Sequence, residues 1–266
     1  MTRSERIIAF VERYIIVPEG ADVGKSMRLR QWQKEIIAGV YDDGEVRRAI
    51  ISLGRKNGKT ALTAMLLLAH LIGPEARRNG QIYSTAQSRD QAAIVFGLAA
   101  RMVRMSRELN DLITVRDTAK ELFAPATGVR YRALSADATT AHGLSPSLAI
   151  HDELGQVRGP RSELFEAIET GMGAQQSPLS LIISTQAPTD ADLLSVLIDD
   201  AQKGGSHRTR LFLFAADADD DPWQAATWRK ANPAIDDFQS LAEMRDLAAT
   251  AQRLPALEAS FRSVPR

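Results

Sequence analysis

Apolar residues recur along the chain in two alternating patterns, short runs typical of buried strands and longer segments with helical spacing. The strand-like runs cover residues 48–53, 81–86, 147–152, 179–186 and 208–216, and the helical segments cover residues 59–72, 89–109, 162–172 and 191–203. This alternation predicts an α/β fold, in which a mainly parallel sheet has helices on both faces. Ligands of such sheets bind at the carboxyl ends of the strands.

Two parts of the chain depart from this alternation. Residues 113–134 contain short strand-like runs joined by turns, which predict a small antiparallel β excursion. After residue 216 comes an acidic turn with Asp220, Asp221 and Pro222, and helical patterns follow it. We therefore predict an N-terminal helical segment at 1–46, a core at 47–216 and a C-terminal helical part at 217–266.

Composition narrows the chemistry that this fold can carry. The chain has 266 residues, 44% of them hydrophobic, with 33 lysines and arginines, 33 aspartates and glutamates, and no cysteine. These values are typical of a folded protein and exclude disulfides and cysteine-based zinc or redox chemistry. The four histidines lack the spacing of a zinc-binding helix, so a bound metal is expected to be a hard cation with oxygen ligands. The zero formal charge excludes a surface that is basic throughout.

No segment has the features of an export signal or a membrane span. Glu12 and Arg13 interrupt the apolar residues of the N-terminus before a signal-peptide core forms. The most apolar stretch, residues 61–73, contains Thr63 and His70 and is shorter than the roughly 20 residues that span a bilayer. We therefore expect a cytoplasmic protein without membrane association.

A phosphate-binding loop is predicted between the first strand and the helix after it. The loop consists of Gly54, Arg55, Lys56, Asn57, Gly58, Lys59 and Thr60. In such a loop, backbone N–H groups at the start of a helix surround the phosphates of a nucleotide. Lys59 is expected to reach the β- and γ-phosphates, and the Thr60 hydroxyl is expected to bind Mg²⁺. The usual pattern begins with a glycine at the position that Leu53 occupies here, so the match is imperfect.

Two adjacent carboxylates, Asp152 and Glu153, follow the apolar run of the strand at 147–152. Asp152 lies 93 residues after Lys59, which leaves room for intervening elements to bring both strand ends to one edge of the sheet. In P-loop NTPases the first carboxylate binds the Mg²⁺ shell and the second polarises the attacking water. A glutamate at the second position favours ATP hydrolysis over phosphoryl transfer to another acceptor. His151 interrupts the apolar run and is expected to be a structural, hydrogen-bonded histidine.

Small polar residues end the strand predicted at 179–186. They are Ser184, Thr185 and Gln186. At the end of a central strand beside the γ-phosphate, such side chains can sense whether the phosphate is present and pass the change to a moving segment. We therefore predict that these three residues form a coupling segment.

Taken in order, these motifs resemble those of the large terminase subunit of tailed bacteriophages, the ATPase that pumps DNA into a preformed capsid. The resemblance spans nearly the whole chain, and within the family this sequence is most similar to the HK97-like branch. It includes Arg30-Gln31-Trp32-Gln33, residues 81–87, 135–143, 220–223 and 231–233, and the three motifs themselves. The phosphate loop of this family commonly has a basic residue in place of the regular first glycine, as Arg55 and Lys56 suggest here.

This resemblance implies a P-loop NTPase fold of the ASCE, RecA-like class, with ATP and Mg²⁺ as cofactors. The residues that it implies for the site are Gln33 for adenine, Lys59, Arg55 and Glu153 for catalysis, and Thr60 and Asp152 for the metal. It also implies that residues 217–266 form a helical lid that moves when the γ-phosphate contact near Thr185 is lost.

Packaging motors of this family work as rings, in which a basic residue of one subunit completes the ATP site of its neighbour. Arginine often lies shortly before the acidic strand, where this chain has His142. Arg130 and Arg132 in the preceding strand are the other candidates for this trans-acting residue, and the sequence leaves the assignment open. The resemblance further implies double-stranded DNA, a portal protein and a small terminase subunit as partners. It also implies a location in the host cytoplasm, with transient docking on the procapsid.

The family has a second, RNase H-like nuclease domain, and this sequence ends about where that domain is expected to begin. We therefore expect this chain to hydrolyse ATP and not to cut DNA. On this interpretation, the chain is the ATPase domain alone, either excised or naturally truncated.

Two other functions remain open from the sequence. A helicase-like DNA translocase shares the phosphate loop and the acidic pair, although the 55 residues after Leu211 are few for a second core domain. A non-catalytic nucleotide-binding assembly module, such as a truncated prophage product, would bind partners without turnover. Phosphate release measured with and without DNA and a partner protein distinguishes these functions.

Overall fold

A computed structural model describes residues 1–86, 88–135, 143–217, 219–258 and 261. The strands are β1 (Arg48–Ser52), β2 (Gln81–Ala86), β3 (Thr114–Arg116), β4 (Glu121–Ala124), β5 (Val129–Ser135), β6 (Leu148–Asp152), β7 (Leu179–Ser184) and β8 (Thr209–Leu213). The α-helices are α1 (Arg3–Tyr14), α2 (Gln31–Tyr41), α3 (Lys59–Leu71), α4 (Arg89–Met105), α5 (Arg107–Leu112), α6 (Glu163–Gly171), α7 (Leu193–Gln202), α8 (Ala225–Ala231) and α9 (Leu241–Arg253). Short 3-10 helices are η1 (Leu154–Gln156), η2 (Met172–Ala174) and η3 (Pro255–Leu257).

The strands form one sheet in the order β3-β4-β5-β2-β6-β7-β1-β8. Six of them, from β5 to β8 in that order, pair in parallel, whereas β3 and β4 pair antiparallel. The predicted α/β fold with a mainly parallel sheet is therefore confirmed. The β excursion is also found, and it extends the main sheet because β5 pairs in parallel with β2.

The strand order brings the predicted motifs to one edge of the sheet. β7 lies between β6 and β1, and the register pairs Asp152 with Ile183 and Ser52 with Ser184. These three strands run in the same direction, so the loops that follow them leave the sheet at the same edge. The phosphate loop, the acidic pair and the coupling segment therefore become neighbours, although they are far apart in the sequence.

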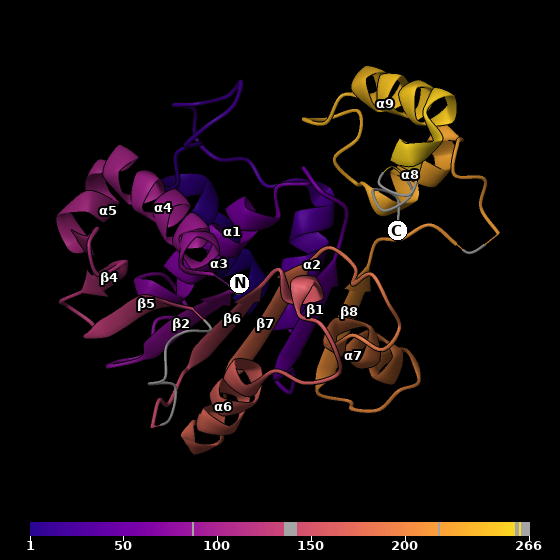
Figure 1. Ribbon diagram of the computed structural model, residues 1–266. Helices are drawn as coiled ribbons and strands as arrows, with labels where there is room; N and C mark the ends of the chain where they lie inside the picture. The colour runs from indigo at the N-terminus through magenta and orange to yellow at the C-terminus, as the bar shows by residue number, and fades with distance from the viewer. Residues whose placement is uncertain (87, 136–142, 218, 259–260, 262–266) are drawn as a thin grey trace.

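Helices cover both faces of the sheet (Figure 1). On one face, α1 to α4 pack with the sheet in the largest hydrophobic cluster. On the other face, Phe165 of α6 and Leu194 of α7 pack with Ile50 and Ile182. The apolar helix α3 is buried on nearly all sides, which accounts for the most apolar stretch of the sequence. Within the described residues, no helix is both long and apolar enough to cross a bilayer.

The helix predicted at residues 89–109 is wrong in its extent, because the chain forms two helices there. α4 ends at Met105 and α5 starts at Arg107. Between them, Ser106 is extended, and its hydroxyl accepts a hydrogen bond from the Leu109 N–H at 3.4 Å. A serine at this position caps a new helix in preference to continuing the old one. The predicted strands at 179–186 and 208–216 also end earlier, at Ser184 and Leu213.

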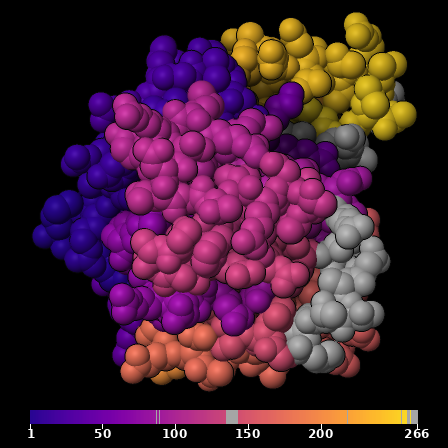
Figure 2. Space-filling model, turned by 90° about the vertical axis from the view of Figure 1, so that its left-hand side faces the viewer, coloured from indigo at the N-terminus to yellow at the C-terminus, as the bar shows by residue number. Residues whose placement is uncertain are grey.

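The C-terminal helices have a hydrophobic cluster of their own. Its buried members are Trp228, Ile235, Met244, Ala248, Ala251 and Phe261. The ring of Trp223 stacks on Phe261 with 5.3 Å between the centroids. Figure 1 shows α8 and α9 to one side of the sheet, and Figure 2 shows them as a yellow ridge beside the indigo N-terminal residues. The domain boundaries at 46 and 216 stay predictions.

A buried polar pair joins α2 to α3. The Tyr41 hydroxyl and His70 Nε2 lie 2.9 Å apart, and both side chains are buried. Burial lowers the pKa of His70 to about 4, because the charged imidazolium would lose its hydration. The folded protein therefore keeps this imidazole neutral at neutral pH.

We expect acid to destabilise the protein through His70. Between pH 6.5 and about pH 4, the unfolded chain takes up a proton at this residue and the folded chain does not. The free energy of unfolding therefore falls as the pH falls, by about 2 kcal/mol between pH 7 and pH 5. Urea unfolding at both pH values measures this loss. His70→Gln keeps an acceptor for the Tyr41 hydroxyl and should remove this part of the pH dependence, so an unchanged dependence would contradict the assignment.

Candidate active site

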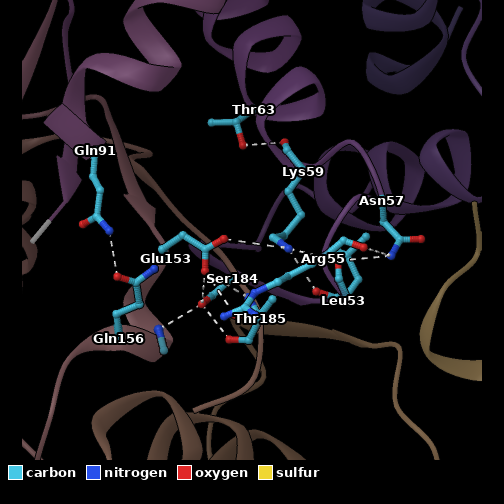
Figure 3. Close-up of polar contacts among 12 residues, drawn as sticks. Leu53, Arg55, Asn57, Lys59, Thr63, Gln91, Glu153, Gln156, Ser184 and Thr185 are labelled. Atoms are coloured by element: carbon cyan, nitrogen blue, oxygen red, sulfur yellow. Dashed lines mark hydrogen bonds and ion pairs between the residues drawn. The ribbon is translucent and has the colours of Figure 1, made fainter. Parts of the chain in front are cut away.

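The phosphate loop connects β1 to α3 over residues 53–58. Gly58, the last residue before α3, has a φ of 72°, in the left-handed region where glycine carries no steric penalty. The chain therefore turns sharply into α3, and the first N–H groups of the helix face the carboxyl edge of the sheet. Arg55 and Lys56 are exposed, and Thr60 lies partly buried in the first turn of α3. The side chain of Arg55 extends toward Ser184 and Thr185 (Figure 3), and its charge helps to lower the pKa of Lys59.

Lys59 lies folded back on its own loop. Its side chain is 7% exposed, and Nζ donates hydrogen bonds to the carbonyls of Leu53 at 3.2 Å and Gly54 at 3.0 Å. Burial lowers the pKa of Lys59, and the negative charges of Glu153 and Asp152 oppose that shift. Nζ also lies 3.8 Å from Glu153 Oε1 (Figure 3). The ammonium group therefore lies between the phosphate loop and the acidic pair.

Asp152 and Glu153 differ in their surroundings. Asp152 is the last residue of β6, and burial, together with the neighbouring charge of Glu153, raises its pKa to about 7. Glu153 has a φ of 53°, in the left-handed region, so the backbone turns directly after the strand. A small cavity of about 30 Å³ borders both carboxylates and is also lined by Thr85, Leu154 and Phe165. Such a cavity has room for about one water molecule.

The coupling segment contacts Glu153 directly. Glu153 Oε2 accepts hydrogen bonds from Thr185 Oγ1 at 3.1 Å and from the Thr185 N–H at 3.4 Å, and it lies 3.5 Å from Ser184 Oγ. Ser184 Oγ also accepts from the Gly155 N–H at 2.9 Å. Gln186 follows this pair and is partly buried. Figure 3 shows Lys59, Glu153 and Thr185 converging on one point.

The buried carboxylate of Asp152 indicates whether Mg²⁺ fits this site, because burial deprives its charge of water. A buried carboxylate with a raised pKa is stabilised by a nearby cation. Mg²⁺ is usually held by one or two carboxylates together with phosphate oxygens and water. Asp152 and the Thr60 hydroxyl supply protein oxygens at the same edge of the sheet, so these residues fit the predicted ion.

Gln33 lies at the start of α2 and is buried. Its Oε1 accepts a hydrogen bond from the Arg30 N–H at 2.9 Å, which is a helix-capping contact. Arg30 in turn forms an ion pair with Asp237, in the segment that lies over the phosphate loop. Gln33 is therefore held near the nucleotide side of the molecule, while its contact with adenine stays a prediction.

The three candidates for the trans-acting residue differ in their surroundings. Arg130 forms an ion pair with Glu121 at 3.1 Å, and its guanidinium lies 5.2 Å from the centroid of the Phe123 ring. Arg132 is exposed and forms no ion pair with any residue that the structure describes. His142 lies outside the described residues. Both arginines are exposed, and Arg132 is the one without an ion pair to a described residue.

Two asparagines connect the phosphate loop to the C-terminal part, and sequence reasoning missed this connection. Asn57 Nδ2 donates to Asn232 Oδ1 at 2.7 Å, and Asn57 Oδ1 accepts from the Ala234 N–H at 3.0 Å. The sequence showed Ala231-Asn232-Pro233 as a matching segment, but it gave no sign that Asn232 is buried against the loop.

His151 is the structural histidine that the sequence predicts. It is buried in β6, where Nδ1 lies 2.9 Å from Thr85 Oγ1 and Nε2 lies 3.2 Å from Glu169 Oε1. Glu169 is in turn paired with Arg48 of β1, and these partners hold the pKa of Glu169 at about 2 despite its burial. This network fixes the strand that carries Asp152 between its neighbours.

Comparison with known proteins adds sequence evidence to this geometry. The family described as the terminase large subunit, ATPase domain, matches residues 31–201. The terminase large subunit of Enterobacteria phage HK97 is 49% identical over 265 residues, which are 99% of this chain and 53% of that protein. The chain thus spans about half the length of this relative.

Solved structures give the same result. The crystal structure of the HK97 bacteriophage large terminase matches with a TM-score of 0.94 and 48% identity, over 100% of this chain and 55% of that chain. The ATPase domain of the Thermus phage P74-26 large terminase matches with a TM-score of 0.57 and 19% identity, over 90% of this chain and 94% of that chain. At this lower identity, the second likeness concerns the fold alone. In sequence and in fold, the chain belongs to the family of terminase large subunits and corresponds to their ATPase domain.

Proposed function

We propose that this chain hydrolyses ATP to move double-stranded viral DNA into a procapsid, as the ATPase part of a packaging motor. The observation that best supports the proposal is the position of Glu153, which touches Lys59 of the phosphate loop on one side and Thr185 of the coupling segment on the other. One carboxylate is thus in contact both with the loop that would bind the phosphates and with the strand end that would respond to loss of the γ-phosphate. Catalysis requires a carboxylate beside the phosphate loop, whereas nucleotide binding alone does not.

When ATP binds, Lys59 exchanges its hydrogen bonds to the carbonyls of Leu53 and Gly54 for contacts with the nucleotide. The ammonium group then reaches the β- and γ-phosphates, while the N–H groups at the start of α3 surround them. Arg55 and Lys56 add positive charge to the loop. Gln33 is proposed to contact the adenine.

Mg²⁺ bound by Thr60 and Asp152 would neutralise the charge that develops on the phosphates. When Lys59 turns to the phosphates, Glu153 loses its cationic neighbour at 3.8 Å and is free to accept a proton from a water molecule. The cavity beside both carboxylates has room for that water. Thr185 keeps Glu153 in position during this step.

Thr185→Val tests this positioning, because valine keeps the shape of threonine but cannot donate to Glu153. We expect kcat to fall about tenfold while the affinity for ATP stays unchanged, since misorientation of a base affects only the chemical step. Steady-state ATPase kinetics and nucleotide titration measure the two quantities. Thr209→Val on β8, outside the site, is the matched control, and equal kcat in both variants would contradict the role of Thr185.

The assembly is part of the same proposal. We propose a homo-oligomeric ring that works with a portal protein and a small terminase subunit, in the host cytoplasm and transiently docked on the procapsid. Within the ring, Arg132 is proposed as the residue that reaches the neighbouring ATP site, because it is exposed and Arg130 is already paired with Glu121. Residues 1–266 are proposed to lack nuclease activity.

The deciding experiment is phosphate release by the purified chain with Mg·ATP, alone, with duplex DNA, and with DNA and the portal protein. Turnover that rises with DNA and portal supports the packaging motor. Turnover stimulated by DNA alone, with translocation along free duplex, would favour a helicase-like translocase. ATP binding without turnover in all three conditions would favour an assembly module and contradict our proposal.

A further inference from the structure

The chain after α8 lies directly on the phosphate loop. The Gly54 N–H donates to the Ala231 carbonyl at 3.2 Å. The Phe238 ring covers Gly58, where a β-carbon would lie only 3.3 Å from the ring. A backbone group of the loop and the glycine before α3 are therefore both occupied by residues 231–238, which we call the docking segment.

Arg30 holds the docking segment from the other side. It forms an ion pair with Asp237, and its guanidinium lies 5.9 Å from the centroid of the Phe238 ring. The segment is thus clamped between the start of α2 and the phosphate loop.

Asn57 binds both the loop and the docking segment. Within the loop, Asn57 Nδ2 lies 3.1 Å from the carbonyls of both Gly54 and Arg55. Toward the docking segment, the same nitrogen lies 2.7 Å from Asn232 Oδ1. Asn57 is 0% and Asn232 1% exposed, so water does not compete for the hydrogen bond between these two side chains.

Asn57 Nδ2 therefore has more acceptors than hydrogens. An amide nitrogen carries two hydrogens, and three oxygens surround this one. The two carbonyls of the loop and Asn232 compete for the two hydrogens. Any change that makes one carbonyl a better acceptor weakens the contact with Asn232.

In the proposed mechanism, nucleotide binding makes one carbonyl of the loop a better acceptor. The Gly54 carbonyl now accepts from Lys59 Nζ at 3.0 Å as well as from Asn57. When Lys59 turns to the phosphates, this carbonyl loses its charged donor, and Asn57 is the side-chain donor that remains. The Asn57 amide then binds the loop more strongly, and its hydrogen bond to Asn232 Oδ1 weakens.

We propose that Asn57 and Asn232 are positioning residues that couple the two events with opposite signs, so that nucleotide in the phosphate loop weakens the docking of residues 231–238. By linkage, the docked segment weakens nucleotide binding by the same factor. The inference rests on the proposed ATPase function. It differs from a route through Thr185, which contacts Glu153 and, among the described residues, forms no hydrogen bond with the docking segment.

Hydrogen exchange measures the first half of this coupling. The Ala234 N–H donates to Asn57 Oδ1, so its exchange rate reports how long the segment stays docked. Addition of Mg·ADP or of a non-hydrolysable ATP analogue to the intact chain should speed this exchange about fivefold or more. Slower or unchanged exchange at a saturating nucleotide concentration would overturn the proposal.

Nucleotide affinity measures the second half. Asn232→Ala should bind the same analogue about fivefold more tightly, because the competing acceptor is gone. Phe238→Ala should act in the same direction and removes a side chain that is 49% exposed, so folding tolerates it. A purely structural role would predict weaker binding in both variants. Lys230→Ala on α8 disrupts only the surface ion pairs with Asp217 and Asp220 and is the matched control.

The outcomes also separate this proposal from the proposed function. Failure of the unmodified chain to bind any nucleotide would contradict the ATPase assignment itself. Nucleotide binding by the unmodified chain, with unchanged or weaker binding by Asn232→Ala and Phe238→Ala, would contradict only the coupling.

Discussion

Lys59→Ala is expected to lose measurable ATP binding and to lower ATPase turnover by a factor of about 10² to 10³. Lys59 is the buried cation of the phosphate loop, and its ammonium group lies between the loop carbonyls and Glu153. Arg55 and Lys56 of the same loop are exposed, so Lys59 is the cation that the loop holds buried. Calorimetric titration with a non-hydrolysable ATP analogue and a phosphate-release assay measure the two effects.

Lys203→Ala is the matched control for this variant. Lys203 follows α7 and is exposed, where it pairs with Asp199. The control should bind and hydrolyse ATP as the unmodified chain does. Equal ATP affinity in Lys59→Ala and Lys203→Ala would show that the loop is an ordinary turn.

Glu153→Gln is expected to keep ATP binding and to lower turnover by about 10² to 10⁴. Glutamine preserves the hydrogen bonds that Thr185 can donate, but it cannot take a proton from water. Because the charge next to Lys59 is also removed, the affinity for ATP should be equal or slightly higher. Single-turnover kinetics with saturating enzyme separate the chemical step from binding.

Glu166→Gln on α6 is the matched control, since Glu166 is partly exposed, lies outside the site and pairs with Arg161. It should leave both binding and turnover unchanged. If Glu153→Gln hydrolyses ATP at the rate of the unmodified chain, another residue must activate the water.

The sheet could be predicted from the sequence because its central strands are buried on both faces. Apolar runs such as 148–150 and 181–183 are typical of strands in the interior of a parallel sheet. The ends of elements were less predictable, because single polar side chains decide them. Ser106 divides one apolar helical pattern into two helices, and periodicity alone does not detect that division.

The site was predictable in part for a similar reason. Lys59 and Thr185 come after strands and Asp152 ends one, and parallel strands end at one edge. What could not be predicted are the contacts that depend on how a later segment folds back. Nothing near Asn57 in the sequence shows that its amide binds Asn232, which lies 175 residues further along. Such contacts depend on tertiary packing, which has no local pattern.

The C-terminal helices have a hydrophobic cluster that is separate from the clusters around the sheet. A unit with its own core opens as one cooperative piece, at a lower free energy than global unfolding. Residues 225–258 should therefore behave as a foldon that undocks while the sheet stays intact. We therefore expect a mechanical division of the molecule into a stiff body, which keeps the geometry of the candidate site, and a compliant body, which can be displaced without dismantling that geometry.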